Sequence, residues 1–332
     1  MSFNEKNFSL DSKSFLCFNY DFTAFKCFCV FYNDSGVHIS NPTNATDYTW
    51  EPFQRKSTCE EGFALVHMDE NGYNNLFLPD SIDILLMGSS QMEAVNVDQK
   101  LNTGYLLNEY LYDYNTYNIG VSGHTVYNCV NNIDYAIDTY QPKKYVVMVI
   151  DTVELDINQM QSVLNGEWQR IPSYDSGVVY TIQKKLPVAK VLYKKIDDWI
   201  NMDYRSISTT DNKTDGDDEY SDTLNKFLYS AKTCCDECGV KLIVVYQPSV
   251  YIDSDGDFIS NTSEKALDTF SVECEEQGIQ FVNMTDDFKE LYNTENVLPH
   301  GFINTAVGVG HLNEYGHKAI AKRVASIIKE ES

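Results

Sequence analysis

The sequence predicts a doubly wound α/β fold, in which two helical layers enclose a central parallel sheet of about five strands. From residue 82 onward, short apolar runs alternate with segments of helical periodicity. These runs are apolar on both faces, as strands are when helices cover both sides of a parallel sheet. The expected strands are Ile82–Met87, Tyr117–Ile119, Tyr145–Ile150, Lys241–Tyr246 and Ile279–Val282.

Composition supports a folded chain and excludes one class of partner. The 332 residues are 43% hydrophobic and 13% aromatic, which can supply a substantial core. The 25 Lys and Arg stand against 49 Asp and Glu, so the formal net charge is −24. Because this charge repels phosphate backbones, we predict that nucleic acid is not a partner.

Residues 1–78 lack the alternation, and we predict an irregular extension that wraps the core. The stretch 15–32 is rich in Phe, Cys and Tyr, but Asn19, Asp21 and Lys26 interrupt it, so it matches poorly a membrane span of about 20 apolar residues. It also lacks the basic region and cleavage site of a signal peptide. We interpret it as a buried or amphipathic segment, with a degenerate anchor as the alternative.

The main domain is predicted over residues 79–331. Apolar residues recur at helical spacing from Val126 to Tyr140, and Pro142 ends that helix before the next strand. Residues 156–220 interrupt the alternation with a Trp-, Tyr- and Lys-rich stretch and then an acidic run. We interpret them as an insertion that either caps a site or decorates the surface.

Neither the cysteines nor the acidic runs predict a metal site. The nine cysteines are odd in number and irregular in spacing, which does not indicate a complete disulfide framework. The single CxxC at Cys235 and Cys238 has no second pair at zinc spacing, and we interpret it as part of a helix. Residues 253–264 match some positions of a calcium loop, but Gly256 stands at the fourth position, where the sixth is needed.

Polar and small residues follow three of the expected strands closely, at Ser90, Gly123 and Asp151. Doubly wound sheets bind ligands outside the carboxyl ends of their strands. Ser90 sits where a strand meets a helix, which exposes its hydroxyl, and His311 stands just ahead of the terminal helix. A serine needs a base to become a nucleophile at neutral pH, so the pair suggests an activated serine.

These segments together resemble the SGNH/GDSL hydrolase superfamily over roughly residues 80–330. Gly88-Ser89-Ser90 stands where that family has Gly-Asp-Ser, and the HLNxxGHxxxA pattern that begins at His311 is the most specific match. The resemblance implies a flavodoxin-like three-layer sandwich. It also implies that Ser90 is the nucleophile, that His311 is the general base, and that the amides of Ser90 and Gly123 form the oxyanion hole.

Two departures from the family pattern concern the residues around this pair. After the third strand the chain has Asp151-Thr152-Val153-Glu154, without the asparagine that would give a third oxyanion donor. Three residues before His311 stands Gly308, where the family has an orienting aspartate. We therefore expect a backbone carbonyl of the glycine-rich turn, Asp151 or Glu154 to hold the imidazole.

Four further polar residues are assigned by position. His124 follows Gly123 and is expected either to contact substrate or to form a solvent-facing cap, and Asn313 is a further candidate contact. His300 is interpreted as a loop residue. His317 should face a side of the terminal helix other than the site.

The resemblance implies a serine esterase that acts on carboxylic esters, with an O-acetyl group on a carbohydrate as the expected substrate, without cofactor or metal. The alternatives are acyl transfer to a cell-envelope glycan, and a glycan-binding protein that keeps the fold without turnover. The sequence style is typical of bacterial proteins. An extracytoplasmic or cell-surface location is slightly favoured over the cytoplasm, and membrane association and oligomeric state stay open.

Overall fold

The computed structural model describes residues 38–40, 48–58, 61–168, 217–260 and 262–331, which belong to one compact unit. The candidate anchor at 15–32 and most of the predicted insertion at 156–220 lie outside the described residues.

The central sheet is parallel and has five strands, which confirms the predicted fold class. Its strand order is β11-β8-β7-β5-β6, so the order reverses between the first strand, β5, and the third, β7. The observed boundaries agree with the predicted ones to within a few residues. The strands are β5 (Ile84–Gly88), β6 (Thr116–Asn118), β7 (Tyr145–Ile150), β8 (Lys241–Tyr246) and β11 (Gln280–Asn283).

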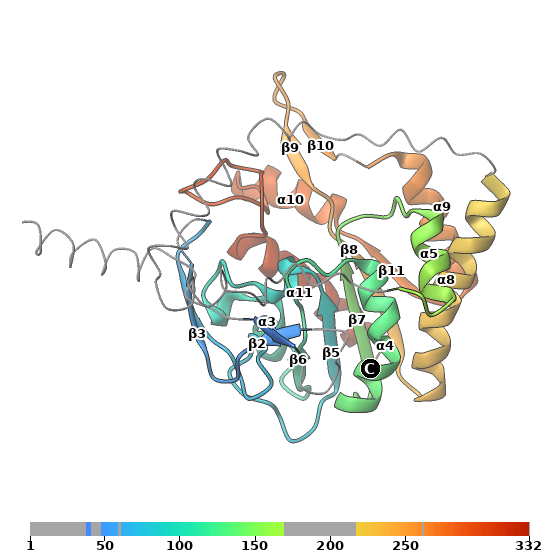
Figure 1. The fold of residues 1–332 in the computed structure, drawn as a ribbon. Coiled ribbons are helices and arrows are strands. Elements are labelled where there is room, and N and C mark those ends of the chain that lie inside the picture. Colours follow the sequence, from blue (N-terminus) through green and yellow to red (C-terminus); the bar gives the residue numbers. More distant parts are fainter. Residues whose placement is uncertain (1–37, 41–47, 59–60, 169–216, 261, 332) are drawn as a thin grey trace, which may run out of the picture. The chain divides into compact units, whose positions relative to one another are not determined.

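Helices cover both faces of this sheet, as Figure 1 shows. Alternate residues of β5 enter the two cores: Leu85 and Met87 pack on one face, Ile84 and Leu86 on the other. This is why the strand is apolar throughout. The first face is covered by α4 (Val126–Tyr140), α5 (Ile157–Leu164), α8 (Asp217–Glu237) and α9 (Glu264–Glu276), and the second by α3 (Thr103–Tyr110), α10 (Thr285–Glu295) and α11 (Glu314–Glu331).

The described parts of the N-terminal extension contain two antiparallel strand pairs, where the sequence predicted irregular structure. These are β1 (His38–Ser40) with β2 (Tyr48–Trp50), and β3 (Arg55–Thr58) with β4 (Ala64–His67). Trp50, Val66 and Met68 form a small core with Val95, which lies shortly after the short helix α2 (Ser90–Glu93). The extension thus packs next to the carboxyl end of β5.

The acidic run that resembles a calcium loop forms the turn between β9 (Val250–Ile252) and β10 (Phe258–Ser260). Asp253 Oδ1 accepts the amides of Asp255 and Asp257, each at 2.9 Å, and these bonds shape the turn. Within the described residues, no three His, Cys, Asp or Glu side chains cluster as metal ligands would. None of the described helices combines the length and apolarity needed to cross a membrane.

His317 is buried between α11 and α3, and its Nδ1 lies 2.9 Å from Thr103 Oγ1. Burial, followed by the charges of His300 and His311, lowers the pKa of His317 from 6.5 to about 3. The folded protein thus keeps this imidazole neutral over a pH range in which the unfolded chain protonates it.

The buried His317 should make stability fall with acidity. Between pH 6.5 and about 3 the unfolded state binds a proton that the folded state does not, so the unfolding free energy decreases as pH falls. His317→Asn should reduce this slope by up to about 1.4 kcal/mol per pH unit. Urea titrations of both proteins at several pH values between about 4 and 6.5 measure the two slopes. Equal slopes would show that His317 does not titrate in this way.

Candidate active site

Ser90 lies at the carboxyl end of β5, where the strand order reverses. Ser89 caps α2 by accepting the amide of Gln91 at 3.3 Å, and Ser90 is the first residue of this short helix. In the parallel register Gly88 pairs with Val149 of β7, and Leu86 with Asn118 of β6. The ends of three strands therefore meet around Ser90, at the place where doubly wound sheets bind ligands.

The side chains of Ser90, His311 and Glu61 form a chain of hydrogen bonds. His311 Nε2 lies 2.9 Å from Ser90 Oγ, and His311 Nδ1 lies 2.6 Å from Glu61 Oε2. A carboxylate only accepts, so Nδ1 carries the proton and Nε2 is free to accept from the serine hydroxyl. The other oxygen of Glu61 accepts the backbone amide of His311. This is the geometry of a serine activated by an oriented imidazole.

Glu61 corrects the expectation that Asp151, Glu154 or a backbone carbonyl orients His311. Asp151 is exposed at the end of β7, while Glu154 Oε1 accepts the amide of Ser263 at 3.3 Å, ahead of α9. Glu61 is 250 residues from His311 in the chain and belongs to the extension, in which no motif marks it. The one signal in the sequence was negative: the residue three before His311 is a glycine.

Several hydrogen bonds fix the segment that carries Glu61. Asn96 Nδ2 donates to Glu61 O at 2.9 Å. The amide of Gly62 donates to Asn304 Oδ1 at 2.9 Å, and Asn304 Nδ2 donates to Gly62 O at 3.2 Å. Asn304 belongs to the loop that leads to His311. The same contacts therefore hold the segments of both Glu61 and His311.

Gly310 leaves the space that the acid occupies. Its φ is +97°, a conformation that favours glycine, and a Cβ at this position would lie 2.0 Å from Glu61 Oε1. The glycine-rich turn is thus required for the contact between Glu61 and His311, although it does not supply the orienting acceptor itself.

Glu61 is ionised in this setting. Partial burial would by itself raise the pKa of its carboxyl, but the hydrogen bonds from the ring and the amide of His311, with the charge of His311, outweigh it and lower the pKa below 4.5. A lowered pKa means that the contact stabilises the fold above pH 4.5 and that this stabilisation is lost as pH falls through the lowered value.

The backbone after His311 is fixed from two sides. The amide of Leu312 donates to Gln91 Oε1 at 2.7 Å, which ties this strand-like segment to α2. Asn313 caps α11 through the amides of Tyr315 and Gly316, and its Nδ2 donates to Leu298 O at 2.8 Å. Asn313 was a candidate substrate contact. These bonds instead use its side chain to cap α11 and to hold the loop at Leu298.

His300 lies in the same loop region and is buried. Its Nε2 is 2.8 Å from Gln247 Oε1, and its ring meets Phe288 edge-on at 5.9 Å. Burial, followed by the charge of His311, lowers the pKa of His300 to about 4, although Glu61 opposes this shift. His300 is therefore neutral at physiological pH, and it lies in the interior in contact with Gln247 and Phe288.

The amides of Ser90 and Gly123 are the candidate oxyanion donors. His124 N donates to Val121 O at 3.1 Å, and the φ of Gly123 is +73°, as in a type II turn with glycine at its third position. Within the described part of the chain, no acceptor is bound to the amide of Ser90 or of Gly123. Both remain available to a ligand oxygen.

His124 and Asp151, two further candidate contacts, differ in their surroundings. His124 is buried and lines a small cavity of about 20 Å³ with Gly88 and Tyr135, so its side chain is not a solvent-facing cap. Asp151 is exposed, but the protein atoms around it displace part of its hydration and raise the pKa of its carboxyl. In the part of the chain that the structure describes, the hydrogen bonds of the Ser90 and His311 side chains involve neither residue.

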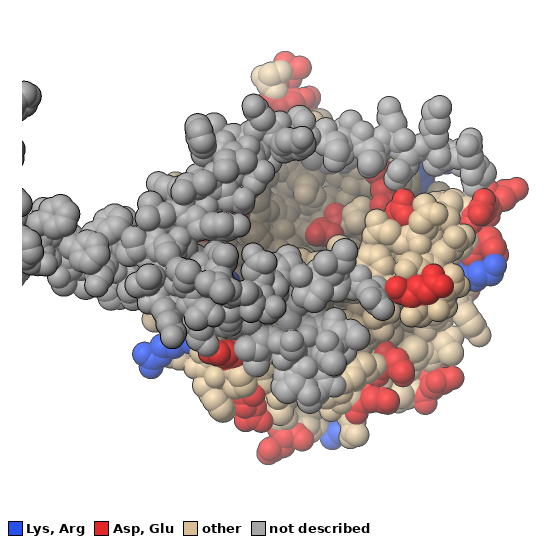
Figure 2. Space-filling view, in the orientation of Figure 1, with Lys and Arg blue, Asp and Glu red and all other residues tan. Residues whose placement is uncertain are grey.

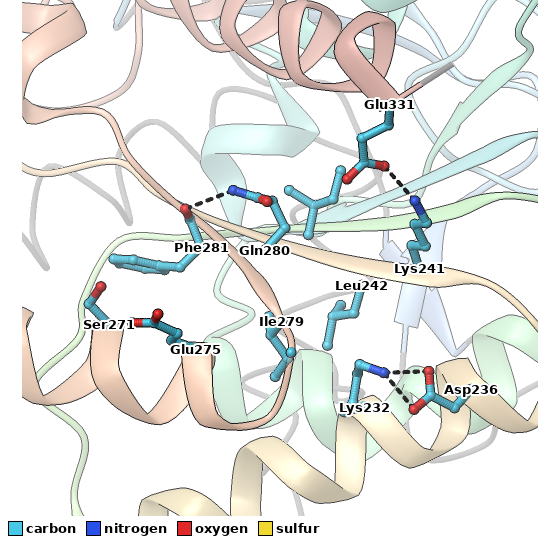
Figure 3. A pocket seen from close by; sticks show the side chains of 12 residues that line it. Lys232, Asp236, Lys241, Leu242, Ser271, Glu275, Ile279, Gln280, Phe281 and Glu331 are labelled. Atoms are coloured by element: carbon cyan, nitrogen blue, oxygen red, sulfur yellow. Dashed lines mark hydrogen bonds and ion pairs between the residues drawn. The ribbon is translucent and has the colours of Figure 1, made fainter.

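Figure 3 shows a larger cavity, of about 590 Å³, whose lining does not include Ser90. It is lined by residues at the start of β8 and β11, including Lys241 and Gln280, and so lies at the amino ends of the strands. Lys241 is paired with Glu331 at 2.9 Å, and Lys232 is paired with Asp236. On the face in Figure 2, Asp and Glu outnumber Lys and Arg, as the net charge of −24 leads one to expect.

Comparisons with known proteins give distant likenesses. No family model matches the chain, and no curated protein matches it. It is similar to the crystal structure of TesA, at 12% identity, with 74% of this chain and 98% of that chain covered and a TM-score of 0.40.

Two further solved structures are a member of the lipolytic protein G-D-S-L family from Veillonella parvula and an acetylxylan esterase from Geobacillus stearothermophilus. The first is 14% identical, with 75% and 99% of the two chains covered and a TM-score of 0.42. The second is 16% identical, with 76% and 96% covered and a TM-score of 0.40. Likenesses this distant assign neither a family nor an activity to this chain.

Glu61 should control the reactivity of Ser90. In Glu61→Gln the second-order rate constant for labelling of Ser90 by a fluorophosphonate should fall, by up to about 10⁴-fold, because the imidazole loses its carboxylate and its fixed tautomer. Glu154→Gln is the matched control and should label at the wild-type rate. Mass spectrometry of the labelled peptide gives the site and the rate. An equal loss in both variants would rule out the assignment of Glu61.

Gly310→Ala should also slow labelling, because its Cβ would displace the Glu61 carboxylate. Gly256→Ala is a matched control: its φ of +90° imposes similar backbone strain, but nothing lies within 4 Å of the added Cβ. We expect both variants to lose stability through backbone strain, Gly310→Ala the more because it also loses the Glu61 contact, and slow labelling only in Gly310→Ala. Thermal melts and labelling rates measure the two effects. Normal labelling of folded Gly310→Ala would contradict the inferred crowding.

Proposed function

We propose that this protein is a serine hydrolase that cleaves carboxylic esters through an acyl-enzyme at Ser90. The observation that supports it most directly is the chain of hydrogen bonds from Glu61 through His311 to Ser90. A serine and a histidine with a structural role alone would not need a third, ionised group to orient the imidazole.

In the proposed reaction Ser90 Oγ attacks the acyl carbon while its proton passes to His311 Nε2, and Glu61 stabilises the imidazolium. The amides of Ser90 and Gly123 bind the oxyanion of the tetrahedral intermediate. The intermediate collapses to the acyl-enzyme, and the alcohol leaves with the proton from Nε2. Water then attacks the acyl carbon with His311 as the base, and the carboxylic acid is released.

We propose two oxyanion donors. The superfamily that the sequence resembles has a third, from an asparagine after the third strand. The loss of one donor typically lowers the rate by about 10²–10³. Such a loss slows a serine hydrolase without abolishing catalysis, because the hydrogen bonds from Glu61 through His311 to Ser90 and the remaining oxyanion amides still act. The presence of Glu61 also removes one of the two grounds for a protein without turnover, namely the missing aspartate before His311.

The substrate that we propose is an O-acetyl group on a carbohydrate. It is supported by the resemblance of the sequence segments around Ser90, Gly123 and His311, and not by a contact that selects a sugar.

A surface feature favours a second candidate, an ester with an apolar chain. Beside the relay, the side chains of Ile303, Val307 and Val309 are 95%, 73% and 61% exposed, and that of Phe63 is 67% exposed. Asn304 joins this loop to Gly62, next to Glu61. The segment from Pro299 to Asn313 contains no charged residue, in a chain that is 22% charged. Exposed apolar surface next to a reactive group suits an apolar ligand.

One experiment tests the activity and separates the two substrates. The purified protein, Ser90→Ala and His311→Ala are incubated with acetylated xylooligosaccharides and with p-nitrophenyl esters of increasing acyl length. We expect turnover that both substitutions abolish. A preference for the acetylated sugar supports the first substrate, and a rise of kcat/KM with acyl length supports the second.

Turnover that survives in Ser90→Ala would reject the proposed nucleophile. If the folded wild-type protein shows neither turnover nor labelling at Ser90, then it is not a hydrolase of this kind.

A further inference from the structure

We propose that Glu93 is a positioning residue of this site: it holds the two oxyanion amides, which come from different strand ends, in a fixed relation. This inference rests on the proposed function. It concerns a side chain that neither the sequence pattern nor the hydrogen-bond relay includes.

Glu93 is 1% exposed, and its carboxylate accepts several hydrogen bonds. Trp50 Nε1 donates to Oε1 at 2.8 Å, and the amide of Ser122 donates to the same oxygen at 3.2 Å. The hydroxyl of Ser122 donates to Oε2. A buried carboxylate is costly unless it is hydrogen-bonded, so Glu93 can stay buried only while these hydrogen bonds are made.

The position of Glu93 links the two candidate donors. It stands three residues after Ser90 on the same short helix, and its partner Ser122 directly precedes Gly123. Ser122 is held by both its amide and its hydroxyl, so its backbone and side-chain torsions are restricted. The orientation of the peptide that follows, which carries the amide of Gly123, depends on these torsions.

Two neighbouring contacts hold the loop after β6 against α2. Asn118 Nδ2 donates to Met92 O at 2.6 Å. A Cβ at Gly120 would lie 2.6 Å from the backbone nitrogen of Glu93, so the two backbones are in direct contact there. These contacts set the distance between the loop and the helix. Glu93 adds the directional bonds that fix the Ser122–Gly123 end of the loop.

Residues of the N-terminal extension hold Glu93 as well. Trp50 is buried, and Lys56 Nζ lies 3.9 Å from the centre of its ring. Asn74 Nδ2 donates to the backbone oxygens of Glu93 and Ala94, at 2.8 and 3.2 Å. Glu93 is thus held through side chain and backbone by a segment that precedes the sheet. Small displacements of a catalytic group lower rates strongly, so loss of the contacts of Glu93 should lower the catalytic rate.

The test compares Glu93→Ala with Glu93→Gln. Alanine removes all the bonds to Ser122. Glutamine keeps the oxygen that accepts Trp50 Nε1 and Ser122 N, and its amide can donate to the Ser122 hydroxyl, which then reverses its direction. Glu273→Ala is the matched control, because Glu273 is also buried and accepts the hydroxyl of Ser221 and the amide of Asn225, but on α9.

Readouts are kcat per active site titrated with a fluorophosphonate, KM, and the inhibition constant of an alkyl boronic acid, which forms a tetrahedral adduct with the serine. For Glu93→Ala we expect kcat to fall about 10–10²-fold with little change in KM, and boronate affinity to weaken with it. Glu93→Gln should recover most of the kcat. Glu273→Ala should lower the melting temperature without lowering kcat per site.

A loss of stability in Glu93→Ala with unchanged kcat per site would overturn the proposal, as would an equal loss of kcat in Glu93→Gln. If Glu93→Ala does not fold, Ser122→Ala and Trp50→Phe each remove one bond to Glu93. Wild-type kcat and boronate affinity in both of these variants would also overturn it. A wild-type protein without turnover and without labelling would reject the proposed function itself, and this inference with it.

Discussion

The contact between Glu61 and His311 is the constraint on which the rest of the site depends. It joins a segment that precedes the sheet to the loop that precedes the terminal helix, 250 residues apart. The ionised carboxylate selects the tautomer of the imidazole, and the tautomer decides whether His311 Nε2 can accept from Ser90. Without this contact the serine at the end of β5 would be an ordinary residue of a strand-to-helix turn.

The extension completes the sheet edge as well as the relay. Asn75 Nδ2 donates to Asn118 O and Asn75 Oδ1 accepts Asn118 N, at 2.9 and 3.0 Å, which pairs backbone groups of the edge strand β6. Trp50 and Asn74 contact Glu93, and Glu61 contacts His311. The extension therefore supports all three elements that surround Ser90: the short helix α2, the glycine turn after β6, and the loop of the base.

The environment gives three histidines of the C-terminal region different properties. His300 and His317 are buried, and burial keeps both neutral over most of the pH range. His311 is partly exposed and faces a carboxylate on one nitrogen and a hydroxyl on the other. Of these three rings, that of His311 lies between a carboxylate and a serine hydroxyl, which is the geometry that general base catalysis requires.

The sequence by itself determined the sheet and the helix from Val126 to Tyr140, because apolar runs of strand length and helical periodicity are local signals. The pairing of Ser90 with His311 was predicted from the resemblance of their two segments to a superfamily pattern. Glu61 and Glu93 could not be found in this way. Glu61 is one of 49 acidic residues and lies in no motif, while Glu93 looks like an exposed helix residue until Trp50 covers it. Likewise, Asn313 resembled a substrate contact and is a helix cap. Local sequence fixes what a residue can do, but which partner it meets is decided by long-range packing, and only the tertiary structure contains that.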